Sequence, residues 1–208
     1  NPKGTDQSWP KSYVDKFYNT QFRRYAADNI RLIQIGAHQE SSLVMWRYYL
    51  SHAEVYGWDG ESDFGVCVEM TTYPQSENQH GQNAKAIMTT VSADSLMKRP
   101  FNIIIYRKAT QSSRQVDAVR RLEKLLSPDE GMLVIENVGD GGLAVLPLMA
   151  ATPRQFTCTF HDYRLHHLVA DNCLYTIKRC REQRKVLANR LVTLTIGLAY
   201  LIVEGLAT

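Results

Sequence analysis

The sequence predicts an α/β domain with a doubly wound, mostly parallel sheet and an antiparallel strand pair near its C-terminus. Short apolar runs at 32–35, 101–106 and 132–136 are separated by segments of helical periodicity, the pattern of parallel strands joined by helices. Two strand-like runs, 155–160 and 172–178, then follow with no helical pattern between them. With 208 residues and 44% hydrophobic content, the chain can bury one large core. We therefore expect a single domain.

This domain is expected to have three parts. Residues 1–29 carry aromatic side chains at helical spacing, which indicates a helix that packs on the sheet. Residues 30–150 form the core that binds a cofactor, and residues 151–208 contain the strand pair and a C-terminal helix. Leucines recur at helical spacing within 182–204, so we expect that helix to pack on the domain or to form a homodimer. Its uncharged run is too short to cross a membrane.

The most informative stretch is a strand, a turn and a helix followed by a second strand and an acid. An apolar strand ends at Gly36, and Ser41 or Ser42 is expected to cap the next helix. The second strand leads to Asp59, roughly 20 residues after the turn, where nucleoside-binding folds place the acid that holds ribose hydroxyls. A dinucleotide fingerprint has three glycines, whereas here Gly36 stands alone, so a nucleoside without phosphates fits better. An ordinary core turn with no ligand fits this stretch equally well.

The remaining core residues extend the alternation. We expect a third strand at 86–90, a fourth at 101–106, a helix at 113–126 and a fifth strand at 132–136. Residues 66–70 are expected to form a strand or a turn of helix, and 73–83 a long loop, with a lid as one option. Ligands of such sheets bind beyond the carboxyl ends of the strands. The residues at those ends are Gly36, Ala37, His38, Asp59, Ser92, Ala93, Asp94, Tyr106, Arg107, Lys108, Glu136 and Asn137.

Charge and cysteine content limit which partners, metal sites and cellular compartments we expect. The formal net charge is +3 and the basic residues are scattered, which does not favour nucleic acid. The four cysteines, Cys67, Cys158, Cys173 and Cys180, show no C-x-x-C pair, so a zinc site is not expected. Free thiols in a reducing compartment, the cytoplasm, are the simplest account, although Cys158 and Cys173 could face each other across a hairpin. The chain begins at Asn1 without a methionine, and we expect it to be part of a larger protein.

Several motifs occur in the same order as in a known family. They are Gly4-Thr5-Asp6-Gln7, Gln34-Ile35-Gly36, Ser42-Leu43-Val44-Met45-Trp46, Phe101-Asn-Ile-Ile-Ile105 and Leu133-Val-Ile-Glu136. The chain resembles class I S-adenosylmethionine-dependent methyltransferases, and more narrowly the sugar O-methyltransferases of the mycinamicin and tylosin pathways. The resemblance implies a Rossmann-like methyltransferase fold and S-adenosyl-L-methionine as cofactor. The residues expected to bind that cofactor are Thr5, Gly36, Ala37, Ser42, Asp59, Ser92, Ala93, Asp94 and Tyr106.

The chain departs from the family at its catalytic motif. The family has Asp-Asp-Gly-Ser-His directly after the fourth strand, where this chain has Tyr-Arg-Lys-Ala-Thr at 106–110. Asn137 replaces the acid that follows Glu136, and Gln34 replaces an acid of the first motif. Two of three expected carboxylate ligands are therefore lost, and a cation at Arg107 would repel a divalent ion. We expect no metal site.

The resemblance, together with these departures, implies a metal-independent O-methyltransferase that acts on a sugar hydroxyl of a glycan or glycosylated small molecule. Such a reaction needs a positioned acceptor and a base near the acceptor oxygen. The candidates for the base are His38 in the first turn, Glu136 after the fifth strand, and His161 or Asp162 after the sixth. A lone loop histidine is, however, more often an ordinary surface residue.

Two alternatives remain open. In the first, the domain has lost catalysis and is a binding or scaffold module beside glycosyltransferase domains of a multidomain, glycan-processing parent. In the second, Arg107, Lys108 and Arg114 bind an anionic acceptor or a nucleotide-linked sugar, although a solvated basic face is the commoner meaning of such residues.

Overall fold

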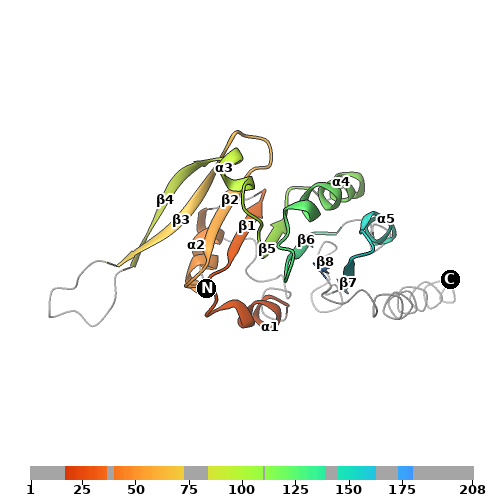
Figure 1. Ribbon diagram of the computed structural model, residues 1–208, viewed down its shortest axis with the longest axis horizontal. Coiled ribbons are helices and arrows are strands. Elements are labelled where there is room, and N and C mark those ends of the chain that lie inside the picture. Colours follow the sequence, from red (N-terminus) through yellow and green to blue (C-terminus); the bar gives the residue numbers. More distant parts are fainter. Residues whose placement is uncertain are drawn as a thin grey trace, which may run out of the picture.

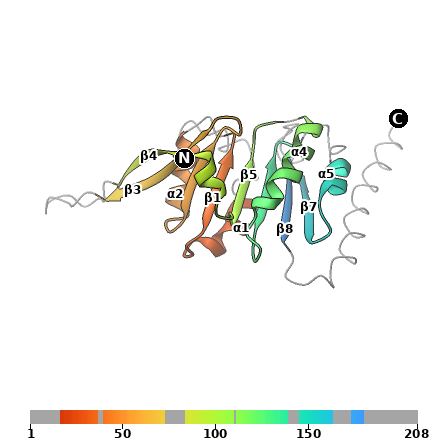
Figure 2. The same ribbon diagram turned by 45° about the horizontal axis from the view of Figure 1, so that its top comes forward.

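The computed structural model describes residues 17–36, 40–72, 84–109, 111–138, 145–162 and 173–179. Within them, eight strands form one sheet in the order β4-β3-β2-β1-β5-β6-β8-β7 (Figures 1 and 2). The strands are β1 Arg31–Ile35, β2 Glu54–Trp58, β3 Phe64–Thr72, β4 Ala84–Ser92, β5 Ile103–Tyr106, β6 Met132–Glu136, β7 Phe156–Asp162 and β8 Cys173–Arg179. The helices are α1 Asn19–Phe22, α2 Glu40–Tyr49, α3 Ala93–Met97, α4 Ser112–Leu122 and α5 Val145–Ala151, with short 3₁₀ turns η2 Arg23–Tyr25 and η3 Glu123–Leu125.

Several predictions concern residues outside the described ranges. They are the turn at Gly4 to Asp6, the cofactor residues Thr5 and Ala37, the base candidate His38, the loop 73–83, Cys180 and the helix at 182–204.

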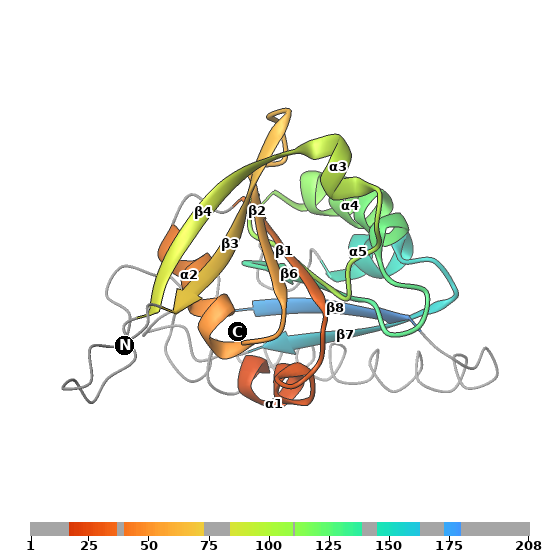
Figure 3. The same ribbon diagram turned by 60° about the vertical axis from the view of Figure 1, so that its left-hand side comes forward.

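The centre of the sheet confirms the predicted parallel core. The order β2-β1-β5-β6 is parallel throughout, and every residue of β1, β5 and β6 is buried, because helices cover both faces. The chain leaves β1 through α2 and leaves β5 through α4, which lie on opposite faces (Figure 3). Strand order therefore reverses between β1 and β5, the position where doubly wound sheets bind ligands.

Residues 64–92 differ from the prediction. The sequence predicts a single third strand at 86–90 and a strand or a turn of helix at 66–70. Instead β3 and β4 form an antiparallel hairpin, and β3 pairs antiparallel with β2. Because β4 thus runs in the same direction as β2, its carboxyl end still reaches the edge of the sheet where β2 ends (Figure 1).

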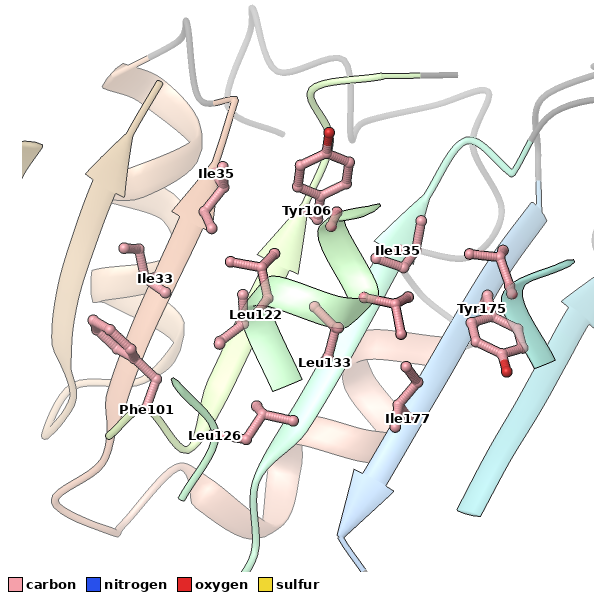
Figure 4. Close-up of a cluster of buried hydrophobic side chains, with 14 of the residues drawn as sticks. Ile33, Ile35, Phe101, Tyr106, Leu122, Leu126, Leu133, Ile135, Tyr175 and Ile177 are labelled. Carbon is pink, nitrogen blue, oxygen red and sulfur yellow. The ribbon is translucent and has the colours of Figure 1, made fainter. Parts of the chain in front are cut away.

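Two hydrophobic layers enclose the sheet. On one face the aromatic rings of Tyr18 and Phe22 pack against Trp46 of α2, and Phe17 packs against both of those rings, as the aromatic periodicity predicts. On the other face, residues of α4 and of the segment after it pack over the central strands (Figure 4). The helix predicted at 113–126 is α4 followed by η3. The helices α3 and α5 were not predicted.

The C-terminal strand pair is confirmed. β8 pairs antiparallel with β6 and with β7. The suggested facing of Cys158 and Cys173 is wrong, because Cys158 pairs with Ile177 and Cys173 pairs with Asp162. Cys67, Cys158 and Cys173 are free thiols. No helix among the described residues is long and apolar enough to cross a membrane.

Candidate functional site

The ends of β1, β2 and β5 converge at the point where strand order reverses. The backbone N–H of Gly36 donates to the carbonyl of Trp58 at 2.8 Å, and the N–H of Arg107 donates to the carbonyl of Ile35 at 2.9 Å. These hydrogen bonds continue the parallel ladders one step past the strands. They hold the turn after β1 between the two neighbouring strand ends, so residues far apart in the sequence form one edge.

Gly36 is required at this edge for two reasons. Its φ is +84°, in the left-handed region that other residues rarely adopt. A Cβ added there would also lie 2.8 Å from the backbone N and Cα of Lys108. The predicted close backbone turn is confirmed, and the group that approaches it is the segment after β5.

Asp59 follows β2 and closes a tight turn. Its Oδ1 accepts hydrogen bonds from the N–H of Glu61 at 2.8 Å, the N–H of Ser62 at 2.8 Å and the Ser62 hydroxyl at 2.9 Å. The hydrogen bonds from Ser62 and Glu61, in that order, lower the pKa of the Asp59 carboxyl. Oδ1 is thus committed to the turn, and Oδ2 makes none of these contacts. The structure places Asp59 at the predicted edge, with only Oδ1 engaged in the hydrogen bonds of this turn.

Lys108 crosses the same edge. Its Nζ forms an ion pair with Oε1 of Glu61 at 2.5 Å, and the lysine side chain is 23% exposed. The lysine therefore links the segment after β5 to the turn after β2. This contact joins residues 47 positions apart in the chain, and nothing in the sequence pattern indicates it.

Gln34 and Ser42 are structural rather than ligand-facing. Trp46 Nε1 donates to Gln34 Oε1 at 2.8 Å, and Gln34 Nε2 donates to the Ser42 hydroxyl at 3.0 Å, with Gln34 and Ser42 fully buried. The indole N–H can only donate, which fixes the orientation of the amide. Ser42 lies inside α2, which begins at Glu40, so the prediction that a serine caps this helix is wrong. Its burial also removes Ser42 from a cofactor-facing position.

The predicted residues after β4 and β5 lie near the same edge. The Ser92 hydroxyl caps α3 by accepting from the N–H of Ser95 at 3.3 Å, and Asp94 lies in the first turn of that helix. Ala93 donates its N–H to the carbonyl of Asp63 at 2.7 Å, which fastens α3 to the loop before β3. Tyr106 is 7% exposed, and its hydroxyl lies beyond the end of β5 (Figure 4). Burial raises the pKa of this phenol.

Glu136, predicted as a catalytic base, is locked in the interior. The side chain is fully buried, and Oε2 lies 3.0 Å from Nε of Arg107, whose side chain is 7% exposed. The hydroxyl of Tyr18, from the segment before α1, donates to Oε1. A carboxylate held this way cannot reach an acceptor hydroxyl, so its placement does not support the predicted role of Glu136. The pair instead ties β5 and β6 to the N-terminal aromatic segment.

His161, the second described base candidate, lies on β7. Its ring contacts Phe17 edge to face at 4.9 Å between centroids, and Nε2 lies 3.3 Å from the Thr176 hydroxyl. Burial, followed by the charge of Lys178, lowers the pKa of His161 to about 4. The imidazole is therefore neutral at physiological pH and a weak base. Its neighbour Asp162 accepts a long hydrogen bond from the Cys173 thiol at 3.6 Å.

Gln115 was missed by sequence reasoning, although it organises the edge. Its amide Nε2 donates to the carbonyls of Ala109 at 2.8 Å and Asn137 at 3.1 Å, and the side chain is fully buried. One residue of α4 thus joins the segments after β5 and β6. Asn137 has a φ of +56°, a conformation that asparagine tolerates better than most residues. Gln115 lies four residues before Val119 and seven before Leu122, so a polar residue on the apolar stripe of the predicted helix was the available signal.

Comparison with solved structures supports this fold. No protein-family model and no curated protein sequence matches the chain. The MycE methyltransferase from the mycinamycin biosynthetic pathway, in complex with Mg and SAH, matches with a TM-score of 0.53 and 17% identity over 85% of this chain. Its complex that also contains mycinamycin VI matches with a TM-score of 0.51 and 15% identity over 84%. The chain has a methyltransferase fold. It spans about half the length of those two chains, 52% and 51%.

The residues at this edge do not fit the magnesium ion of those complexes. Arg107 contributes a cation to the space beside Glu136, and Asn137 offers no carboxylate. Among the described residues, no group of three or more histidine, cysteine, aspartate or glutamate side chains could hold a metal ion. Hard divalent cations are bound through several oxygen ligands, which Arg107 and Lys108 do not supply.

A hollow among the described residues lies elsewhere. A groove of about 880 Å³ runs between α2 and β4 and is lined by Ser41, Val44, Met45, Tyr48, Tyr49, Ala86 and Met88. Its lining is apolar apart from hydroxyl groups and contains no acid or base. The groove therefore offers none of the groups that methyl transfer needs, and the edge at Gly36 and Asp59 remains the candidate site.

Proposed function

We propose that this domain binds S-adenosylmethionine where β1, β2 and β5 end and transfers its methyl group to a hydroxyl of a sugar or glycan, without a metal ion. The observation that carries the proposal is the unit of β1, the Gly36 turn, α2, β2 and Asp59 at the reversal of strand order. The fold shared with two SAH complexes supports the choice of cofactor. The sugar acceptor rests on the family resemblance and on the mycinamycin pathway of that neighbour.

The protein's own groups would divide the work. Asp59 Oδ2 would accept hydrogen bonds from ribose hydroxyls, while the left-handed turn at Gly36 lets the segment after β5 pack at the same edge. When bound, the cofactor supplies an electrophilic methyl group on a sulfonium. The acceptor oxygen would form its bond to the methyl carbon as the carbon–sulfur bond breaks, and the hydroxyl proton must pass to a base. Holding the acceptor oxygen in line with the methyl group supplies much of the rate enhancement.

The base is the weakest part of the site. Glu136 is enclosed by Arg107 and Tyr18, and the low pKa of His161 makes it a poor proton acceptor at neutral pH. His38, outside the described residues, stays a prediction. This shortage of bases among the described residues favours the second candidate, a domain that binds the cofactor or a glycan without turnover.

Methyl transfer from radiolabelled S-adenosylmethionine to a panel of glycosides separates the two candidates. The proposal predicts a labelled, alkali-stable ether product whose yield is unchanged by EDTA. Loss of the product in EDTA and its return with Mg²⁺ would refute metal independence. Binding of the cofactor with no product from any acceptor would support the binding module, and a His161→Gln variant with full activity would eliminate His161 as the base.

A further inference from the structure

We propose that the side chain of Lys108 fills the nucleoside end of the cofactor site in the ligand-free protein, and that a ligand must displace it to bind. This inference rests on the proposed function, because it takes Gly36 and Asp59 as the place of the nucleoside.

The path of Lys108 carries the inference. Its backbone packs against Gly36, where an added Cβ would lie 2.8 Å from N and Cα of the lysine. The side chain then passes over Gly60, where an added Cβ would lie 3.5 Å from Cδ and 3.6 Å from Nζ. It ends on Glu61, with 2.5 Å between Nζ and Oε1. Lys108 thus runs from the end of β5, past the end of β1, to the turn after β2.

Of the two glycines, Gly60 marks where a ligand could approach. Gly36 and Gly60 have φ values of +84° and +83°, so neither position tolerates a side chain without strain. The backbone of Lys108 fills the space over Gly36, whereas its side chain covers Gly60. A nucleoside that approached the backbone of Gly60 and reached Asp59 would occupy the space that the Lys108 side chain now covers. The lysine also contributes to the lowered pKa of Asp59, which places its charge close to that carboxylate.

The ion pair that holds Lys108 over this site is weak enough for a ligand to break. Glu61 is 78% exposed, so solvent screens the ion pair and such a pair contributes little stability. Removing it should therefore tighten binding modestly, by about two- to five-fold, which corresponds to at most about 1 kcal/mol. High salt should reduce the difference in ligand affinity between wild type and variants, since salt weakens the ion pair of Lys108 and Glu61 in the wild type.

Calorimetric titration with S-adenosylhomocysteine tests the displacement through the direction of the effect. Lys108→Ala is expected to bind two- to five-fold more tightly than wild type, and Glu61→Gln to tighten binding by no more than that. The double variant should match Lys108→Ala, because the two side chains act as one closure. Lys124→Ala, which removes an exposed lysine of η3, is the matched charge control and should leave the affinity unchanged.

The outcomes separate this inference from the proposed function. Weaker binding by Lys108→Ala would make the lysine a ligand contact, and unchanged binding would place it outside the site; either result overturns the displacement. If wild type and all variants fail to bind while thermal unfolding shows them folded, the cofactor site itself is refuted and the displacement falls with it.

Discussion

The variant Arg107→Met would leave the Glu136 carboxylate in the interior without its cationic partner. Both side chains are almost completely buried and their charged atoms lie 3.0 Å apart, so water can replace neither partner. Breaking such a pair from one side typically costs about 3–5 kcal/mol, against a total stability of about 5–15 kcal/mol for a domain. We therefore expect Arg107→Met and Glu136→Gln each to lower the free energy of unfolding by about 3–5 kcal/mol.

The double variant shows whether the cost comes from the uncompensated charge. Arg107→Met with Glu136→Gln removes both charges and keeps an acceptor for the Tyr18 hydroxyl. It should be more stable than the sum of the single losses predicts, with a coupling energy of several kcal/mol. Urea unfolding at pH 7 measures all three variants. The control is Arg99→Met, whose ion pair with Glu54 at 3.3 Å is exposed and should cost about 0–1 kcal/mol.

Two results would refute this reasoning. Single losses below about 1 kcal/mol would mean that water reaches the pair. Strict additivity of the two losses would mean that Arg107 and Glu136 do not interact, and Glu136 would again be free to act as the predicted base.

Three further predictions concern the fold around the site. The pKa of His161 is lowered to about 4, so the unfolded chain binds more protons than the folded chain between about pH 6.5 and 4. The free energy of unfolding should therefore fall by about 3 kcal/mol as the pH drops through that window. Urea unfolding of His161→Gln should lose this dependence of stability on pH. Gly36→Ala should cost more than about 2 kcal/mol by thermal unfolding, since it adds left-handed strain and a contact with the Lys108 backbone, and a near-neutral change would show that the turn adapts. Trp46→Phe should cost about 1–3 kcal/mol because Gln34 Oε1 loses its donor in the core, and Trp46→Phe combined with Gln34→Leu should recover part of that loss.

Local patterns in the sequence predicted the centre of the fold well. The strand at 132–136 has the predicted bounds, and the Gly36 turn and Asp59 stand at the expected edge, because buried parallel strands are continuous apolar runs that end at turn residues. The hairpin of β3 and β4 could not be predicted in the same way, since the direction of a strand depends on its partner and not on its own residues. The short helix α5 contains Pro147, which gave no helical signal.

The candidate site was predicted only in part, because its interactions are long-range. Glu136 lies at the predicted strand end, but its partner Tyr18 is 118 residues away and reaches it only because the aromatic segment packs on the sheet. The ion pair of Lys108 with Glu61 also depends on which strands become neighbours. Position along a strand could thus be inferred from sequence, whereas the state of the side chain there could not.

Titration with S-adenosylhomocysteine tests the central claim most directly. The wild-type protein should release heat and gain thermal stability as the ligand saturates the edge at Gly36 and Asp59. Asp59→Ala should weaken binding by at most a few kcal/mol, as expected for charge-assisted hydrogen bonds, while Asp59→Asn, which keeps an acceptor for the turn at Oδ1, separates loss of charge from loss of the turn. An absence of both heat and thermal stabilisation in folded wild-type protein would contradict the account.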